Sequence, residues 1–190
     1  MKLHHLVLLA GATTLAACTA DSPTQAVSTD ATAASSVTAS ASGGGRAQLP
    51  PGFSALDFAL SANGIADGSG TGQFRFRHES ASGTTDFDGS VTCVSFDAAN
   101  NRAWIGGVVT QNNSTNPALQ GAIHQPGRDA WFRVVDNGED NAAAPDRTTV
   151  LGFEGGGGII TSAQYCAAQL WTANDANTWA VDRGNIQVRP

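Results

Sequence analysis

The chain has 190 residues, 14% of them charged, and a formal net charge of −6 at pH 7. Nucleic acids and anionic lipid surfaces recruit proteins through basic patches, and Lys2 is the only lysine here. This acidic balance argues against both as partners, and no nucleic-acid partner is expected. A compositional bias against lysine would leave the same pattern.

Residues 1–17 have the features of a bacterial lipoprotein signal peptide. Lys2 gives a basic start, and the apolar run that follows is too short to span a bilayer as a helix. Leu15-Ala-Ala-Cys18 supplies the small residues needed for cleavage and resembles the lipobox, which implies that Cys18 becomes the acylated first residue. Several acyl chains together anchor a protein stably to a membrane. Thr19, rather than aspartate, then favours the outer membrane or cell surface. The alternative is an ordinary secreted protein.

Residues 18–48 are predicted to form the lipid anchor and a flexible linker. Ala, Ser and Thr dominate this stretch, which contains no aromatic residue and includes Gly43-Gly-Gly45. Such a composition cannot bury enough apolar surface to offset the entropy lost on ordering. The mean reach of a flexible chain of this length is roughly 30 Å, enough to hold a small domain clear of a lipid surface.

Residues 49–190 predict a single all-β domain, because short apolar runs alternate with turn residues. The clearest strand is Gln73–Glu79, where Phe74, Phe76 and His78 point to one face. Residues 87–109 read as a hairpin that turns at two asparagines. The expected architecture is an antiparallel β-sandwich of about eight strands, with helix restricted to a turn or two near residues 162–170.

An acidic, turn-rich loop follows the predicted strand that begins at Trp131. It carries Asp136, Glu139, Asp140 and Asp146. Calcium takes six to eight oxygen ligands, largely from carboxylates, amides and carbonyls, and loops of this composition can supply them. The spacing does not match an EF-hand, so calcium is a hypothesis based on composition, and no other cofactor is expected. The alternative is a solvated connection in which Asp146 pairs with an arginine.

Cys93 and Cys166 remain once Cys18 carries lipid. In an oxidising compartment an even pair of cysteines forms a disulfide by default. This bond would tie the central hairpin to the last third of the domain. A zinc site is disfavoured, because His78 and His124 have no ligand spacing to a cysteine.

The sequence is also compatible with two other functions. The first is carbohydrate binding, which would need at least two coplanar, exposed tryptophans, whereas tryptophans in a core would be structural. The four candidates are Trp104, Trp131, Trp171 and Trp179.

The second is an envelope hydrolase. It would need a cleft in which Asp86, Asp88, His78 or His124 has a perturbed pKa. The chain contains no Gly-x-Ser-x-Gly or His-Glu-x-x-His motif, so no catalytic residue is assigned.

Six segments spread over residues 53–190 follow one another in a distinctive order: Gly72–Phe76, Gly89–Cys93, Asn101–Gly107, Phe132–Gly138, Ala144–Arg147 and Gly184–Val188. In that order they resemble a group of small exported bacterial proteins of unassigned function, often lipoproteins, with a β-rich domain. The resemblance implies an extracytoplasmic domain with Cys93 and Cys166 as a structural pair, and no activity to transfer. We expect a lipid-anchored protein of the cell envelope that acts by binding or as a structural module, with a protein or glycan partner, rather than by catalysis.

Overall fold

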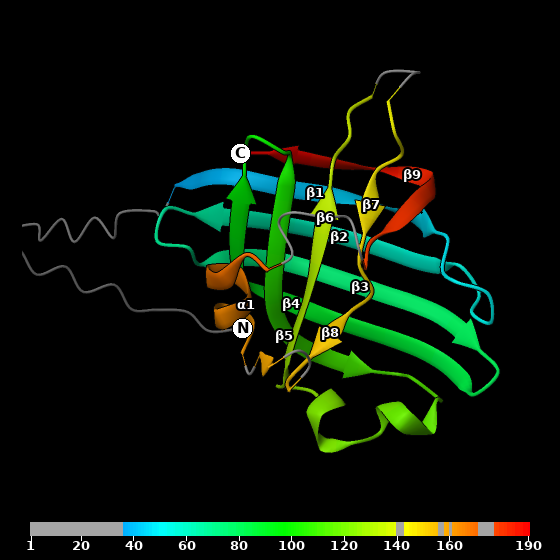
Figure 1. Cartoon of the computed structure of the whole chain (residues 1–190). Helices are drawn as coiled ribbons and strands as arrows, with labels where there is room; N and C mark the ends of the chain where they lie inside the picture. Colours follow the sequence, from blue (N-terminus) through cyan, green and yellow to red (C-terminus); the bar gives the residue numbers. More distant parts are fainter. Residues whose placement is uncertain (1–35, 140–142, 156–157, 160, 171–176) are drawn as a thin grey trace, which may run out of the picture. The chain divides into compact units, whose positions relative to one another are not determined.

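The computed structural model describes residues 36–139, 143–155, 158, 159, 161–170 and 177–190. Within these ranges the chain is mostly β, which confirms the predicted antiparallel all-β class (Figure 1). The strands are β1 (Val37–Ala47), β2 (Leu56–Ile65), β3 (Gly70–Ser80), β4 (Gly83–Asp97), β5 (Arg102–Asn112), β6 (Asp129–Val135), β7 (Arg147–Thr148), β8 (Gly152–Phe153) and β9 (Trp179–Arg189). The helix α1 (Ser162–Ala168) and the short 3-10 helices η1 (Pro117–Leu119) and η2 (Ala122–His124) complete the described elements.

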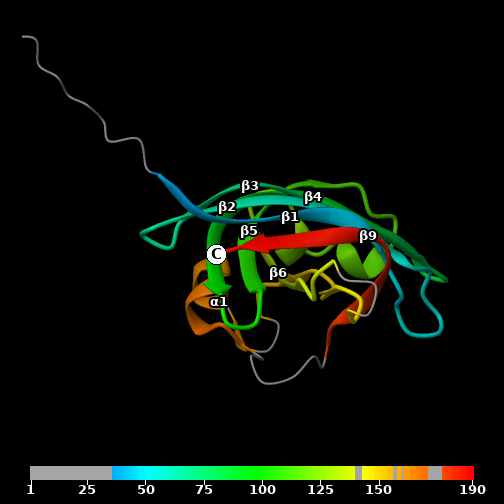
Figure 2. The ribbon, with the colours of Figure 1, turned by 90° about the horizontal axis from the view of Figure 1, so that it is seen from above.

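The described strands form one sheet that closes on itself. Their order is β5-β4-β3-β2-β1-β9-β7-β6-β8, and β5 also pairs with β6. Figure 2 shows β2, β3 and β4 arching over β5 and β6. The register of β4 against β5 shifts near Gly89 and again before Cys93. Such bulges bend strands, so the sheet curls round instead of splitting into two layers. A sandwich of two separate sheets is therefore not confirmed.

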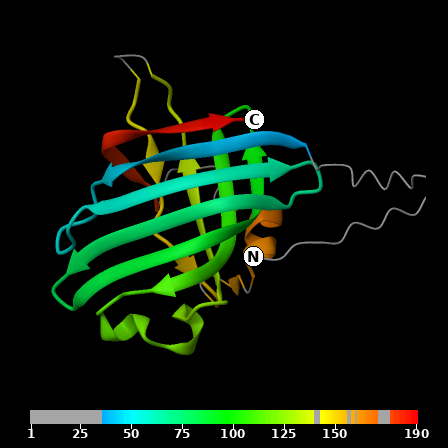
Figure 3. The same ribbon diagram turned by 180° about the vertical axis from the view of Figure 1, so that it is seen from behind.

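Strand β1 corrects the part of the linker prediction that covers residues 37–47. Val37–Ala47 pairs antiparallel with both β2 and β9, and Figure 3 shows it lying between them. Ala41 and Ala47 are fully buried. A β-carbon at Gly45 would lie 2.0 Å from the carbonyl oxygen of Arg183, so glycine permits the close approach of β1 and β9. The folded unit thus begins before Val37 rather than at residue 49. Residues 1–35, with the predicted signal peptide and Cys18, lie outside the described residues.

Aromatic rings fill the interior of the closed sheet. Phe132 of β6 lies with its ring centroid 5.3 Å from that of Phe74 and 4.8 Å from that of Phe76, both on β3. The inward orientation of Phe74 and Phe76 confirms the alternation predicted for Gln73–Glu79. A β-carbon at Gly89 would lie 2.0 Å from the Phe74 ring, so this glycine makes room for it. Each buried ring contributes about 1.5–3 kcal/mol to folding.

A second, smaller core lies on the outer side of the sheet, beneath α1. Trp104 and Trp131 are buried there together with Tyr165 of the helix, whose ring centroid is 5.7 Å from that of Trp131. A disulfide joins Cys93 on β4 to Cys166 on α1, which is the pairing that the sequence predicted. The bond fixes the helix over its cluster. None of the helices in the described ranges has the length and apolar character needed to cross a membrane.

Candidate functional site

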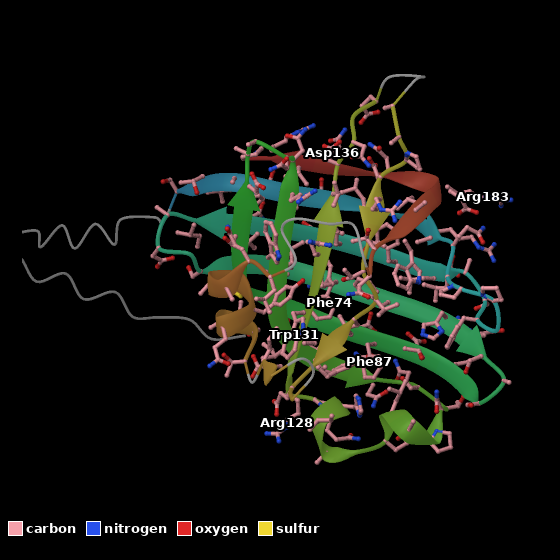
Figure 4. All side chains as sticks on the ribbon, in the orientation of Figure 1. Phe74, Phe87, Arg128, Trp131, Asp136 and Arg183 are labelled. Carbon is pink, nitrogen blue, oxygen red and sulfur yellow. A yellow bond between two sulfur atoms is a disulfide. The ribbon has the colours of Figure 1, made fainter. Side chains whose placement is uncertain are left out.

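Carboxylates of the acidic loop join the loop to strand β9. Asp136 follows β6, and Figure 4 shows it beside β9. Its Oδ2 accepts a hydrogen bond from the backbone N–H of Val188 (2.9 Å), and the Oδ2 of Asp146 accepts one from Ile186 (2.7 Å). The two residues of β7 pair with β9 only at its first two residues. Beyond those two residues, the carboxylates of Asp136 and Asp146 accept the hydrogen bonds that a neighbouring strand would otherwise accept from β9.

Asp146 is the most buried of these acids, with 7% of its surface exposed. Its Oδ1 accepts a second backbone hydrogen bond, from Asn137 (2.9 Å). Burial raises the pKa of the Asp146 carboxyl; its two backbone hydrogen bonds lower that pKa, and the carboxylates of Asp136 and Glu139 add to the rise. Both oxygens of Asp146 are thus used by the backbone, where the sequence had suggested an arginine partner.

Glu139 also contacts β9. Its Oε1 accepts hydrogen bonds from the side chains of Asn185 (2.7 Å) and Gln187 (3.2 Å), which hold the pKa of Glu139 below its usual value. Asp140 lies outside the described residues. In the part of the chain that the structure describes, no group of three or more His, Cys, Asp or Glu side chains is placed to hold a metal ion. Three of the four predicted calcium ligands therefore have hydrogen-bonding roles at β9.

An apolar pocket lies at the end of the closed sheet where β1 ends and β2, β4 and β9 begin. Its volume is about 290 Å³. The wall is built from segments far apart in the sequence, and among its residues are Phe53, Phe76, Val150, Phe153 and Trp179. Concave, mostly apolar sites of this kind at the mouth of a closed sheet commonly bind small molecules.

Two side chains at this pocket are unusually exposed. Phe53 is 51% exposed and Val150 is 40% exposed, and they belong to a set of only four large hydrophobic residues exposed among the described residues. Single exposed hydrophobic residues are ordinary, and here two of them lie at the rim of the same apolar pocket.

The histidines lie in and behind the pocket wall. His78 lines the pocket and is half-buried, which confirms the prediction from its place on the face of Phe76. His124 packs behind the wall, with its ring centroid 4.6 Å from that of Phe153 and 6.3 Å from that of Phe87, a residue labelled in Figure 4. Burial lowers the pKa of both histidines, so both imidazoles are neutral at pH 7.

The predicted hydrolase candidates do not come together. Asp86 and Asp88 pair with Arg75 at 3.3 and 3.7 Å, away from the pocket. His78 lies opposite Thr85 in the β3–β4 register, but no hydrogen bond joins their side chains. Nucleophilic catalysis needs a nucleophile and a base within hydrogen-bonding distance. The described residues lining the pocket offer no such pair.

The described tryptophans do not form an exposed face for stacking on sugars. Trp104 and Trp131 are 0% and 4% exposed, and the Trp104 indole N–H donates to the Leu170 carbonyl (2.8 Å). Trp179 contributes to the pocket wall, and Trp171 lies outside the described residues. Trp104 and Trp131 thus have the structural role in a core that was the alternative to sugar binding. A polar groove of about 600 Å³ on the outer face of β2–β5 has no exposed aromatic side chain in its wall.

Phe53, Val150 and Phe153 line the pocket, and none of them was predicted from the sequence to have a functional role. One local signal was available: Pro50-Pro-Gly52 predicts a turn, and a turn can present the following Phe53 at the surface. The other two residues come together with it only through long-range strand pairing.

No protein-family model, curated protein or solved structure matches this chain.

Proposed function

We propose that this protein is a lipid-anchored, non-enzymatic binding module of the bacterial cell envelope, and that it binds a small apolar molecule in the pocket at the end of its sheet. The observation that carries the proposal is the 290 Å³ pocket itself, with aromatic walls and two exposed apolar residues, Phe53 and Val150. Burying apolar ligand surface against such walls contributes about 25 cal/mol for each Å² removed from water. The pocket thus provides a driving force for binding without any catalytic group.

Attachment to the membrane is proposed from the lipobox-like segment that ends at Cys18. The described chain enters the sheet at Val37, whereas Leu49 in the pocket wall lies just beyond the other end of β1. An eleven-residue strand spans roughly 35 Å. Val37 and the pocket therefore lie at opposite ends of β1.

A separate hypothesis is that the acidic loop binds calcium. Calcium binding by the 136–146 loop would stabilise the folded state, and a saturable rise in melting temperature with calcium, reversed by a chelator, would support it. Loss of that rise in an Asp140→Ala variant would place the ion in this loop.

A neutral fluorescent probe, N-phenyl-1-naphthylamine, tests the pocket. The full chain carrying Cys18→Ser is used, so that no acyl chain competes for the site. We expect saturable binding with enhanced probe fluorescence. Val150→Asp places a charge at the rim and should weaken binding about tenfold or more, because the charge would be partly desolvated by the probe.

Val37→Asp is the matched control. Val37 is 56% exposed at the far end of β1, so the same substitution there should leave binding unchanged. Equal affinities of the two variants would show that the probe binds elsewhere, and the pocket would lose its assigned role.

A further inference from the structure

The pocket wall contains two polar atoms that lack a hydrogen-bond partner among the described residues. The indole Nε1 of Trp179 and the Nδ1 of His78 are buried, and neither has a hydrogen-bond partner within the described ranges. Both side chains line the pocket. The indole N–H can only donate, and leaving a buried donor unpaired costs free energy. A ligand that supplies an acceptor to Trp179 would recover that cost.

The described residues of the wall carry no formal charge. His78 is its only ionisable side chain, and burial keeps that imidazole neutral at pH 7. A bound carboxylate or ammonium group would lose its hydration without gaining an opposite charge. The wall therefore favours neutral molecules over charged ones of the same shape.

The size of the pocket and its aromatic walls further restrict the class of ligand that it can bind. Its 290 Å³ lies at the small end of the range for ligand sites, which suits a molecule of two or three aromatic rings or a short chain. Phe53, Phe76, Phe153 and Trp179 give it aromatic surfaces. Flat rings pack against such surfaces in offset or edge-on arrangements.

We propose that the ligand is a neutral, largely apolar molecule of this size that carries one carbonyl-type oxygen, which accepts a hydrogen bond from the Trp179 indole N–H. This assignment rests on the proposed binding function and names its ligand class. The indole N–H of Trp179 is covered from water, so the carbonyl group reaches it only when the side chains that cover it move. The exposed Phe53 ring lies at the rim, where its centroid is 5.8 Å from the His78 ring in an edge-on contact. Exposed side chains change rotamer within nanoseconds.

The test compares two compounds of nearly equal size, 2-acetylnaphthalene and 2-ethylnaphthalene, as competitors of N-phenyl-1-naphthylamine on the Cys18→Ser chain. The ketone should bind about tenfold more tightly, the effect of one well-formed hydrogen bond. The anion 2-naphthoate should bind more weakly than the ketone at pH 7.5. In Trp179→Phe, which keeps a ring but has no N–H, the two neutral compounds should bind equally, while Val37→Asp should keep the tenfold preference.

The outcomes separate this inference from the function on which it rests. No saturable binding of the probe would overturn the proposed function itself. Probe binding with equal affinities for ketone and hydrocarbon would leave the pocket as a site and overturn the ligand class. A preference that persists in folded Trp179→Phe would overturn the assignment of the donor. If that variant does not fold, as judged by circular dichroism, the wild-type preference and the naphthoate comparison decide the ligand class.

Discussion

Replacing Asp146 by alanine tests whether carboxylates hold the sheet together along β9. Asp146 accepts hydrogen bonds from the backbone N–H groups of Ile186 and Asn137. Alanine leaves both donors without this acceptor, at about 1–3 kcal/mol each. It also removes the cost of burying a carboxylate, which offsets part of the loss. We expect the free energy of unfolding to fall by about 2–4 kcal/mol.

Urea unfolding of the Cys18→Ser chain, followed by tryptophan fluorescence, measures this change. Asp57→Ala is the control, because Asp57 is an exposed carboxylate on β2. Asp146→Asn keeps one acceptor oxygen and should lose about half as much as alanine. A loss in Asp146→Ala below about 0.5 kcal/mol, no larger than that of an ordinary surface substitution, would refute the structural role of this carboxylate.

The same site has a defined pH dependence. Burial raises the pKa of folded Asp146 above its ordinary value of 3.8, so the folded protein binds this proton more tightly than the unfolded chain does. Protonation of Asp146 thus stabilises the fold fully below pH 3.8, and that contribution is lost as pH rises through the raised pKa. Asp146→Asn has no such proton. The stability of the wild type relative to this variant should therefore fall with rising pH across that window.

Three further predictions test other parts of the structure. Replacing both Cys93 and Cys166 by alanine should lower the free energy of unfolding by about 4 kcal/mol, because the bond spans 73 residues; an unchanged urea midpoint would show that α1 docks without it. Gly45→Ala should cost about 3 kcal/mol, because its β-carbon would meet the Arg183 carbonyl, whereas Ser42→Ala on the exposed side should be nearly neutral; two neutral variants would argue that β1 is a linker after all. Cys18→Ala should move the protein from the membrane fraction to the soluble fraction of its host, and unchanged membrane recovery would contradict the lipid anchor.

Local patterns in the sequence predicted part of the fold. The alternation around Phe74 and Phe76 follows directly from the two-residue period of a strand with one buried face. The pairing of Cys93 with Cys166 followed from counting cysteines in an exported chain. Both inferences need only nearby residues or composition, which a single sequence contains.

Strand β1 could not be predicted from local sequence patterns. Its alanines and glycines are weak strand formers, and such a composition is also typical of a linker. Val37–Ala47 is ordered by hydrogen bonds to β2 on one side and to β9 on the other. Most of the chain separates β1 from β9 in the sequence. Small residues that look unstructured in sequence are here the ones that let three strands approach closely.

The pocket was not predictable for a related reason. Phe53, Val150 and Trp179 come from three distant segments and meet only because β5 and β6 close the sheet. The acidic loop was recognised from its composition, but the role of its carboxylates was not. Their hydrogen bonds to β9 form because β7 has only two residues, and no local sequence pattern predicts so short a strand.

The indole N–H signals of a ¹⁵N-labelled Cys18→Ser chain test whether ligands bind at the end of the sheet. The chain has four tryptophans, and Trp179→Phe identifies the signal of the one in the pocket. On titration with 2-acetylnaphthalene, we expect a saturable shift of the Trp179 signal, while Trp104, whose N–H is bonded to the Leu170 carbonyl in the second core, stays unchanged. Saturable shifts that spare Trp179 and appear elsewhere would place the binding site outside this pocket and contradict the account.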